Sequence, residues 1–463
     1  MILLKSMGWI IWFLFLILVI APLAAGEGNH DSNEPIPDSF ENPPMERFDP
    51  FAGVERSGRI PKAKLPPDIK KPDRWRYVPE GRIKPGNIVD RLFVSSFIAP
   101  IFFFEQDIGA GGGVAITDID FRQKRRREFA GAFLSYTTEG QQRYTAIWQR
   151  WRHHRELKNG GVIFEDRSFM RVSAGYRKTL TLRFYGLGAD TSVDDETSYT
   201  DELVAAKFLW QQSFPDPGDS LVFQLGLSGE KHNLSEGYVS GVPSTEEIYP
   251  ELFEAGDNYD MLKLHGQLRY DTRDSQHAPY RGGMLALNIE GVPLQSNDQC
   301  SAIFAFNGNW VKKVPGLFHE DGDAGEAHPP TDVIALDARL FSTQGDLPFW
   351  QLPSLGGRNT LRGYIQNRFT DEAAWHATAE YRFWIIPRGV RFTDSINIER
   401  FGGALFYDIG TVAESLEKLP RVAIHDSYGL SFRFSLERSA LFRADLGFSD
   451  EGTNFTFTYG LSF

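Results

Sequence analysis

The chain has 463 residues, a net charge of -12 at pH 7 and a single cysteine, Cys300. The acidic balance argues against nucleic acid as a partner. One cysteine excludes an intramolecular disulfide and a cysteine-rich metal site, and the length is ample for a large core or a large closed sheet.

The first 26 residues have the pattern of a secretory signal peptide. Lys5 lies in a short basic start, an apolar run covers 8–23, and small residues follow at 24–26. The run is also long enough to be an uncleaved anchor helix. We expect an exported protein.

Residues 27–90 are rich in proline and charged side chains, with prolines at positions 35, 37, 43, 44, 66, 67 and 72. Proline lacks a backbone donor and blocks both helix and sheet. We therefore predict a Pro-rich disordered arm in the periplasm rather than a folded domain.

From residue 91 to 463 apolar and polar side chains alternate, as in 221–228, 262–271 and 428–437. Such a period of two is typical of strands with one apolar and one polar face. Sixteen segments follow this pattern, beginning near residues 93, 109, 128, 142, 167, 199, 219, 260, 282, 301, 332, 375, 399, 426, 440 and 454. Their spacing suits the ~10-residue spanning strands of an outer-membrane barrel.

Alternation alone does not separate a lipid-exposed barrel from a soluble sandwich, but the last residues favour the barrel. Aromatic and apolar side chains alternate with small and polar ones to the final position, at Phe455, Phe457, Tyr459, Leu461 and Phe463. A lipid-facing closing strand explains this ladder. We predict an all-β fold, a 16-stranded antiparallel transmembrane barrel over 91–463. Tyr459, Leu461 and Phe463 are its candidate assembly signal for the cell's own barrel-assembly machinery.

An arm that enters from the periplasm predicts which connections face which side. The connections 215–219, 437–439 and the basic turn around Arg125 are then periplasmic turns, and 315–330 is an unusually long one. The long connections 233–258 and 342–374 face outward. His319 and the carboxylates up to Glu326 crowd the 315–330 turn, but they lack EF-hand spacing, which favours a solvated loop over a cation site.

The stretch 355–364 carries two adjacent glycines, Gly356 and Gly357, and then Arg362, Gly363 and Tyr364. In an ordinary surface loop Arg362 would be solvated. Inside a barrel, a glycine-bent loop could bring this one cation to the wall.

The order of six motifs resembles the barrel of the BamA/TamA-type outer-membrane assembly factors, the bacterial surface antigen superfamily. They are Ala99-Pro100-Ile101 with the Gly109 to Gly113 run; Phe184-Tyr185-Gly186-Leu187-Gly188; Asp271-Thr272-Arg273-Asp274 with Pro279 and Gly282-Gly283; Leu355-Gly356-Gly357 with Leu361-Arg362-Gly363-Tyr364; Glu380-Tyr381-Arg382-Phe383; and Phe406-Tyr407-Asp408-Ile409-Gly410.

The resemblance implies that the sixth outer loop folds into the lumen and that Arg362 pairs with Asp408 and Glu380. The alternation independently permits this, because outward Tyr381 and Tyr407 turn both carboxylates inward. A guanidinium fork suits two carboxylates. Such pairing could serve function directly or simply brace the barrel.

Family members that assemble or secrete proteins carry periplasmic POTRA modules, whereas 27–90 shows no amphipathic periodicity, so the chain resembles a barrel-only member. Two hypotheses remain. The first is an insertase or translocase that takes unfolded client proteins into outer-membrane lipid by opening between its first and last strands. The second is a closed pore or structural surface barrel. A lipid enzyme lacks a recognisable catalytic set, so we expect a non-enzyme without cofactor or metal.

Overall fold

A computed structural model describes residues 52–83, 97–105, 108–253, 256–276, 278–323, 325–327, 329–391, 397–436, 440–461 and 463. The expected signal peptide lies outside the described residues. No helix within the described ranges is both long and apolar enough to span a membrane.

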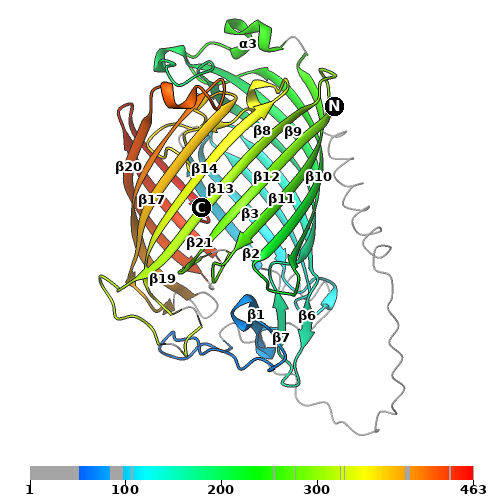
Figure 1. Ribbon diagram of the computed structural model, residues 1–463, viewed down its shortest axis with the longest axis vertical. Coiled ribbons are helices and arrows are strands. Elements are labelled where there is room, and N and C mark those ends of the chain that lie inside the picture. The colour runs from blue at the N-terminus through cyan, green and yellow to red at the C-terminus, as the bar shows by residue number, and fades with distance from the viewer. Residues whose placement is uncertain are drawn as a thin grey trace, which may run out of the picture.

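Sixteen strands in the described part of the chain form one closed antiparallel barrel (Figure 1). They are β2 (Phe97–Glu105), β3 (Gly109–Asp118), β4 (Glu128–Thr137), β5 (Gln142–Trp151), β8 (Phe169–Phe184), β9 (Thr197–Phe214), β10 (Leu221–Glu236), β11 (Asn258–Asp271), β12 (Gly282–Gln295), β13 (Ser301–Val314), β14 (Asp332–Gln344), β17 (Ala373–Ile386), β19 (Asn397–Ala413), β20 (His425–Leu436), β21 (Ala440–Ser449) and β22 (Gly452–Tyr459). The two-residue β18 (Val390–Arg391) pairs with β19. The predicted fold is confirmed, and the predicted start of the first strand, near 93, lies outside the described residues.

The alternation places apolar side chains on the outer wall and polar ones inside. On β10, Phe223, Leu225 and Leu227 are exposed on the outside, whereas Glu230 and His232 are buried. This is the arrangement that lipid outside and a polar lumen inside require.

The two ends of the barrel differ in their connections (Figure 1). One end, here called the loop end, carries the long connections 237–257 and 345–372, with α3 (Thr245–Ile248) and the 3-10 helices η5 (Pro250–Phe253) and η6 (Phe349–Gln351). The other, the turn end, carries shorter connections such as 215–220, with the longer connections 152–168 and 315–331 as exceptions. The predicted turn 215–219, the turn around Arg125 and the long turn 315–330 thus lie at one end, and the predicted loops 233–258 and 342–374 lie at the other. The predicted turn 437–439 lies outside the described residues.

Part of the predicted arm, residues 52–83, lies along the turn end, and we call this segment the strap. Its strand β1 (Trp75–Val78) pairs with β7 (Val162–Glu165), which pairs with β6 (His154–Glu156). It also contains two 3-10 turns, η1 (Pro72–Arg74) and η2 (Glu80–Arg82). The rest of the arm, 27–51 and 84–90, lies outside the described residues.

The strap contacts several turns in succession. The carbonyl of Ile60 accepts from Ala327 N–H at 2.7 Å, Lys70 pairs with Asp216 at 2.7 Å, and the carbonyl of Arg82 accepts from Arg126 at 2.5 Å. The prediction of a mostly disordered arm did not anticipate these contacts. Proline blocks helices, but an extended, proline-rich chain still offers carbonyls and side chains to neighbouring turns.

Acidic side chains of the 315–330 turn take part in this attachment. Asp323 accepts two hydrogen bonds from Arg59, each at 3.0 Å, and Glu326 pairs with Arg388 at 2.8 Å. These carboxylates are thus neutralised by arginines of the strap and of the β17–β19 connection.

Ile60→Asp is expected to loosen the strap from the β13–β14 turn. Ile60 is 6% exposed, and burying an isoleucine side chain is worth about 1.5–3 kcal/mol. Limited trypsin digestion at Lys62 and Lys64 should therefore accelerate by about tenfold or more, since cleavage follows the population of the open segment. Ile60→Val, which keeps most of the apolar contact, is the matched control; equal digestion of both variants would contradict the attachment.

Candidate functional site in the barrel lumen

The connection between β14 and β17 folds back into the barrel. Its base is a short pair, β15 (Ser354–Leu355) with β16 (Phe369–Thr370), and residues 361–364 between them are buried. Gly356 and Gly357 have φ angles of 117° and 83°, and a Cβ on Gly356 would lie 2.2 Å from the carbonyl oxygen of Ile365. The sharp bend therefore requires glycine at this point, as the double glycine indicated.

Arg362 at the tip of this loop contacts both inward carboxylates. Its Nε and Nη2 donate to the two oxygens of Asp408 at 2.9 and 2.7 Å, and its Nη1 donates to Glu380 at 2.5 Å. Its backbone N–H also donates to Asp408, at 3.1 Å. These carboxylates, on β19 and β17, are the two partners that the family resemblance implied.

Further side chains complete this cluster. The guanidinium carbon of Arg362 lies 3.6 Å from the centroid of the Phe406 ring, and Thr378 donates to Asp408 at 2.8 Å. The second oxygen of Glu380 accepts from Arg382 at 2.7 Å and from Arg433 at 2.9 Å. Glu380 is therefore shared by three arginines, from the loop, β17 and β20.

The side chains of this cluster are almost fully shielded from solvent: Arg362 is 2% exposed, Glu380 2% and Asp408 0%. Burial lowers the pKa of the Arg362 guanidinium, but the Asp408 and Glu380 carboxylates raise it by more, so its pKa lies above the ordinary value. The loop is thus attached to the wall by a permanent charge whose partners are buried with it.

The residues around Arg362 attach the loop to the last two strands. Asn454 of β22 donates to the carbonyls of Arg362 and Tyr364 at 3.1 and 3.0 Å, and Ser449 donates to the carbonyl of Gly363 at 3.0 Å. The phenol of Tyr364 donates to Asp450 at 2.5 Å. The loop tip therefore bridges β17 and β19 to the β21–β22 hairpin.

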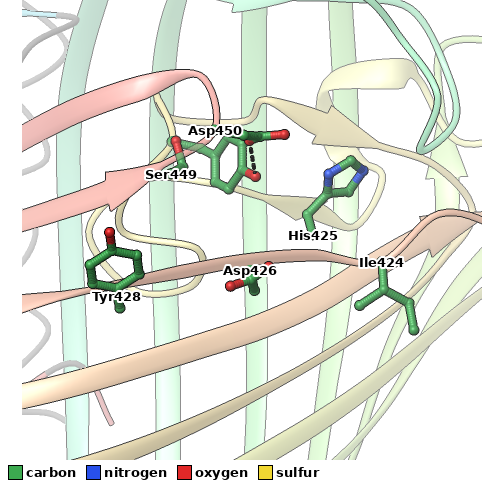
Figure 2. A pocket seen from close by; sticks show the side chains of 7 residues that line it. Ile424, His425, Asp426, Tyr428, Ser449 and Asp450 are labelled. Carbon is green, nitrogen blue, oxygen red and sulfur yellow. Dashed lines mark hydrogen bonds between the residues drawn. The ribbon is translucent and has the colours of Figure 1, made fainter.

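A small pocket lies beside this bridge (Figure 2). It is lined by Tyr364, Ile424, His425, Asp426, Tyr428, Ser449 and Asp450. Burial raises the pKa of the Tyr364 phenol, and the hydrogen bond to Asp450 raises it further. The phenol therefore stays protonated and acts as a donor that holds the hairpin.

Gly447→Ala is expected to displace the loop tip, because a Cβ at this position would lie 2.4 Å from the carbonyl oxygen of Arg362. Inserting a methyl group into such a close contact typically destabilises by about 1–3 kcal/mol. We expect a lower temperature for loss of the compact, heat-modifiable band on gels. Gly266→Ala is the control, since a Cβ on Gly266 would meet no atom within 4 Å; an equal loss in the control would show a general glycine effect instead.

The three terminal residues proposed as an assembly signal do not share one environment. Tyr459, the last residue of β22, is 62% exposed on the outer wall, and Leu461 is half-buried. Phe463 instead packs inside the barrel against Tyr280, Val311, Val333 and Ala335. The expectation that Phe463 faces lipid is therefore wrong. The strand ends at Tyr459 and Gly460 has a φ of 94°, so the period of two no longer sets the direction of later side chains.

Sequence reasoning missed several members of the cluster. Phe406 and Arg382 lay within recognised motifs without an assigned role, and Arg433 lay on the polar face of its strand. The alternation of apolar and polar side chains had predicted that Arg433 points into the lumen, and this was the signal in the sequence that could have found it. Its partner was not deducible, because register between β17 and β20 depends on the intervening strand β19.

Comparison with known proteins gives one family match and several structural neighbours. The Omp85 superfamily domain matches residues 128–463. Two solved structures resemble the chain: BamA from Haemophilus ducreyi lacking POTRA domains 1-3, with 13% identity, a TM-score of 0.48, and coverage of 78% of this chain and 69% of that one; and CdiB from Acinetobacter baumannii, with 11% identity, a TM-score of 0.48, and coverage of 79% and 59%. Comparison with curated protein sequences finds no significant match.

The family match runs from the first residue of β4 to the final residue of the chain. It leaves out β2 and β3 but includes the whole lumen loop and both of its carboxylate partners, and it covers well over half of the chain. The chain therefore belongs to the Omp85 superfamily, whose barrels lie in the outer membrane.

Proposed function

We propose that the protein inserts or translocates other proteins at the outer membrane by opening sideways between β2 and β22. The observation that carries this proposal is the weakness of that seam. Within the described residues the ladder between β2 and β22 has two residue pairs, Phe104 with Phe457 and Glu105 with Thr456. The ladder between β21 and β22 has eight, from the Phe442–Tyr459 pair to the Ser449–Gly452 pair.

A seam of this kind offers backbone donors and acceptors to an incoming strand. Unpaired backbone groups in lipid are strongly unfavourable, so a client strand that adds to the edge of β2 would satisfy both chains. The lumen loop supports the proposal, because it holds the β21–β22 hairpin to the rest of the wall through Asn454 and Asp450. Opening can then occur at the seam without loss of the hairpin.

In this proposal the turn end, where the strap lies, faces the periplasm. The partners are membrane lipid and unfolded client proteins, and no catalysed reaction, cofactor or metal takes part. Binding and strand exchange alone supply the driving force. The terminal residues Tyr459, Leu461 and Phe463 remain the proposed signal for the barrel's own assembly.

A second candidate is a closed pore or structural surface barrel. Its specific support is the aromatic cluster at the loop end, where Phe349 lies 4.7 Å from Phe184 and 5.0 Å from Tyr199 between ring centroids. In this candidate, the loop inside the lumen and this cluster together would restrict what passes through the barrel.

Reconstitution into liposomes distinguishes the two candidates. The purified protein is tested for ion conductance and for the rate at which an unfolded outer-membrane barrel inserts, with protein-free liposomes as the control. Faster client insertion supports the insertase. Steady conductance with no acceleration would reject it in favour of the pore, and neither activity would favour a structural role.

A further inference from the structure

The first part of the β13–β14 turn folds back over the outer wall of the barrel. On β14, Ile334 and Leu336 are 38% and 43% exposed on the outside. The alternation therefore places Asp332, two residues nearer the turn end, on the same outer face. Residues 315–320, here called the flap, cover this carboxylate and leave it with no exposed surface. A charge on the lipid side of the wall is thus shielded by the chain itself.

Asp332 holds the flap in place by accepting four hydrogen bonds. Two come from the flap, from Leu317 N–H at 2.8 Å and from Nε2 of His319 at 3.2 Å. Two come from the wall, from the Tyr381 hydroxyl at 2.7 Å and from Trp384 N–H at 3.2 Å. A buried carboxylate is costly unless such donors satisfy it. The side chain of His319 is 3% exposed, so the prediction of a solvated loop is wrong at this residue.

The flap returns to the wall through a tight bend at Gly316. A Cβ at this position would lie 2.4 Å from the carbonyl oxygen of His319 and 2.7 Å from Cε1 of its ring. Its N–H donates to Asp321 at 3.2 Å. Any side chain at this position would therefore push His319 away from Asp332.

The apolar side chains of the flap point away from the protein. The ring of Phe318 lies 5.6 Å from that of Phe383 on the outer face of β17, between centroids. Phe318 is nevertheless 58% exposed and Leu317 62%, and Ile385 on the adjoining wall is 45% exposed. Exposed apolar surface of this kind marks contact with a membrane or a partner. Its continuity with the lipid-facing wall favours the membrane.

The neighbouring strand indicates the depth at which the flap lies. Trp310 of β13 is 46% exposed on the outer wall, and Lys312, two residues nearer the turn end on the same face, is exposed. Tryptophan followed by lysine is typical of the boundary between acyl chains and headgroups. The flap is therefore at the membrane–water interface, where Lys312 can meet a headgroup phosphate.

We propose that the flap, seated on Asp332, is a lipid anchor. Leu317 and Phe318 insert among the acyl chains of the phospholipid leaflet at the turn end, beside a headgroup that pairs with Lys312. The free energy comes from burial of apolar side chains at the interface, as for other membrane-surface elements. The inference requires a barrel in a membrane and is independent of whether the protein acts as an insertase or a pore.

The remainder of the same turn holds the strap. Asp323 accepts two hydrogen bonds from Arg59, and Lys62 N–H donates to the carbonyl of Gly325 at 2.7 Å. The turn therefore contacts lipid with its first half and the strap with its second. In this way the anchor keeps the strap close to the membrane surface.

Depth-dependent fluorescence quenching tests the anchor in the full-length chain with Cys300→Ser. Phe318→Cys carries a polarity-sensitive fluorophore, and the protein is reconstituted in phosphatidylcholine vesicles with a spin label near the headgroup or near the chain end. Quenching by the headgroup-proximal label should be about twofold stronger or more, because interfacial side chains lie about 5–10 Å deep. Leu336→Cys, deeper in the wall, should shift this ratio toward the chain-end label. Lys70→Cys on the strap, 71% exposed, should respond only to aqueous iodide.

Two variants release the flap without changing its apolar side chains. Gly316→Ala pushes His319 from its place, and Asp332→Asn keeps the size of the seat but removes its charge. In each, quenching of the Phe318→Cys probe by the headgroup-proximal label should fall by about twofold or more, since a crowded or unsatisfied contact displaces the segment. Gly266→Ala, whose Cβ would meet no atom within 4 Å, should leave the quenching unchanged.

Weak quenching by both lipid labels, with free access of iodide to the Phe318→Cys probe, would overturn the anchor. Efficient cross-linking of unlabelled Phe318→Cys between two copies would also overturn it and assign the patch to self-association. Lipid quenching that is unchanged in both Gly316→Ala and Asp332→Asn would reject Asp332 as the seat of the flap.

Discussion

Arg362→Ala is expected to lower the free energy of unfolding of the barrel by about 3–5 kcal/mol, the usual effect of removing one partner from a buried ion pair. Asp408, with no exposed surface, would keep only Thr378 of its described side-chain donors. Glu380 would still accept from Arg382 and Arg433, so the larger part of the loss arises at Asp408. Heat-modifiable gel mobility and thermal unfolding by circular dichroism measure it.

Arg362→Lys tests the geometry of the site rather than its charge. An ammonium cannot form the two parallel hydrogen bonds that the guanidinium makes with Asp408, so a partial loss is expected. Lys418→Ala is the matched control, because Lys418 and its partner Glu414 are 53% and 68% exposed and such pairs contribute about 0–1 kcal/mol. A loss at Arg362 no larger than that of the control would show that the buried cluster does not hold the loop.

A disulfide between β2 and β22 is expected to abolish client insertion. In the Cys300→Ser background, Phe104→Cys and Phe457→Cys join residues that already lie opposite each other across the seam. The bond would tie the two edges that lateral opening must separate, and a strand could no longer add to β2. The liposome insertion assay, run before and after reduction, measures the effect, and activity should return on reduction.

Two controls accompany the locked seam. Each single cysteine variant shows whether the substitutions themselves reduce activity. A disulfide between Phe442→Cys and Tyr459→Cys, which are paired across β21 and β22, adds the same bond at a place that is not required to open. Full insertion activity with the β2–β22 seam locked would exclude lateral opening between these strands.

The barrel was predictable because its signal is local and repeated. Each strand alternates on its own, so sixteen segments could be recognised without knowledge of their partners. The end of the barrel at which each connection lies followed from the order of these strands, because successive connections of an antiparallel barrel alternate between its two ends. The inward direction of Glu380 and Asp408 was also a local property, inferred from the neighbouring outward residues Tyr381 and Tyr407. Pairing with Arg362 required the family resemblance in addition, because the loop and the two strands approach only in three dimensions.

The strap shows where local patterns stop being informative. Its prolines correctly exclude long helices and strands, but its contacts with Asp216, Ala327 and Arg126 depend on the closed ring of turns that only the barrel creates. The sharing of Glu380 among three arginines is similar, since two of them lie on strands joined through β19.

The sequence by itself determined the strand count, the closed antiparallel topology and the face of the wall on which each charge lies, because a period of two is set by backbone geometry. Only the tertiary structure decided that Arg382 and Arg433 share Glu380 with the loop, where the strap lies and that Phe463 enters the lumen. Those outcomes depend on competition among distant partners for the same carboxylate, turn or apolar patch, and a chain end released by Gly460 is free of the alternation that governs the strand before it.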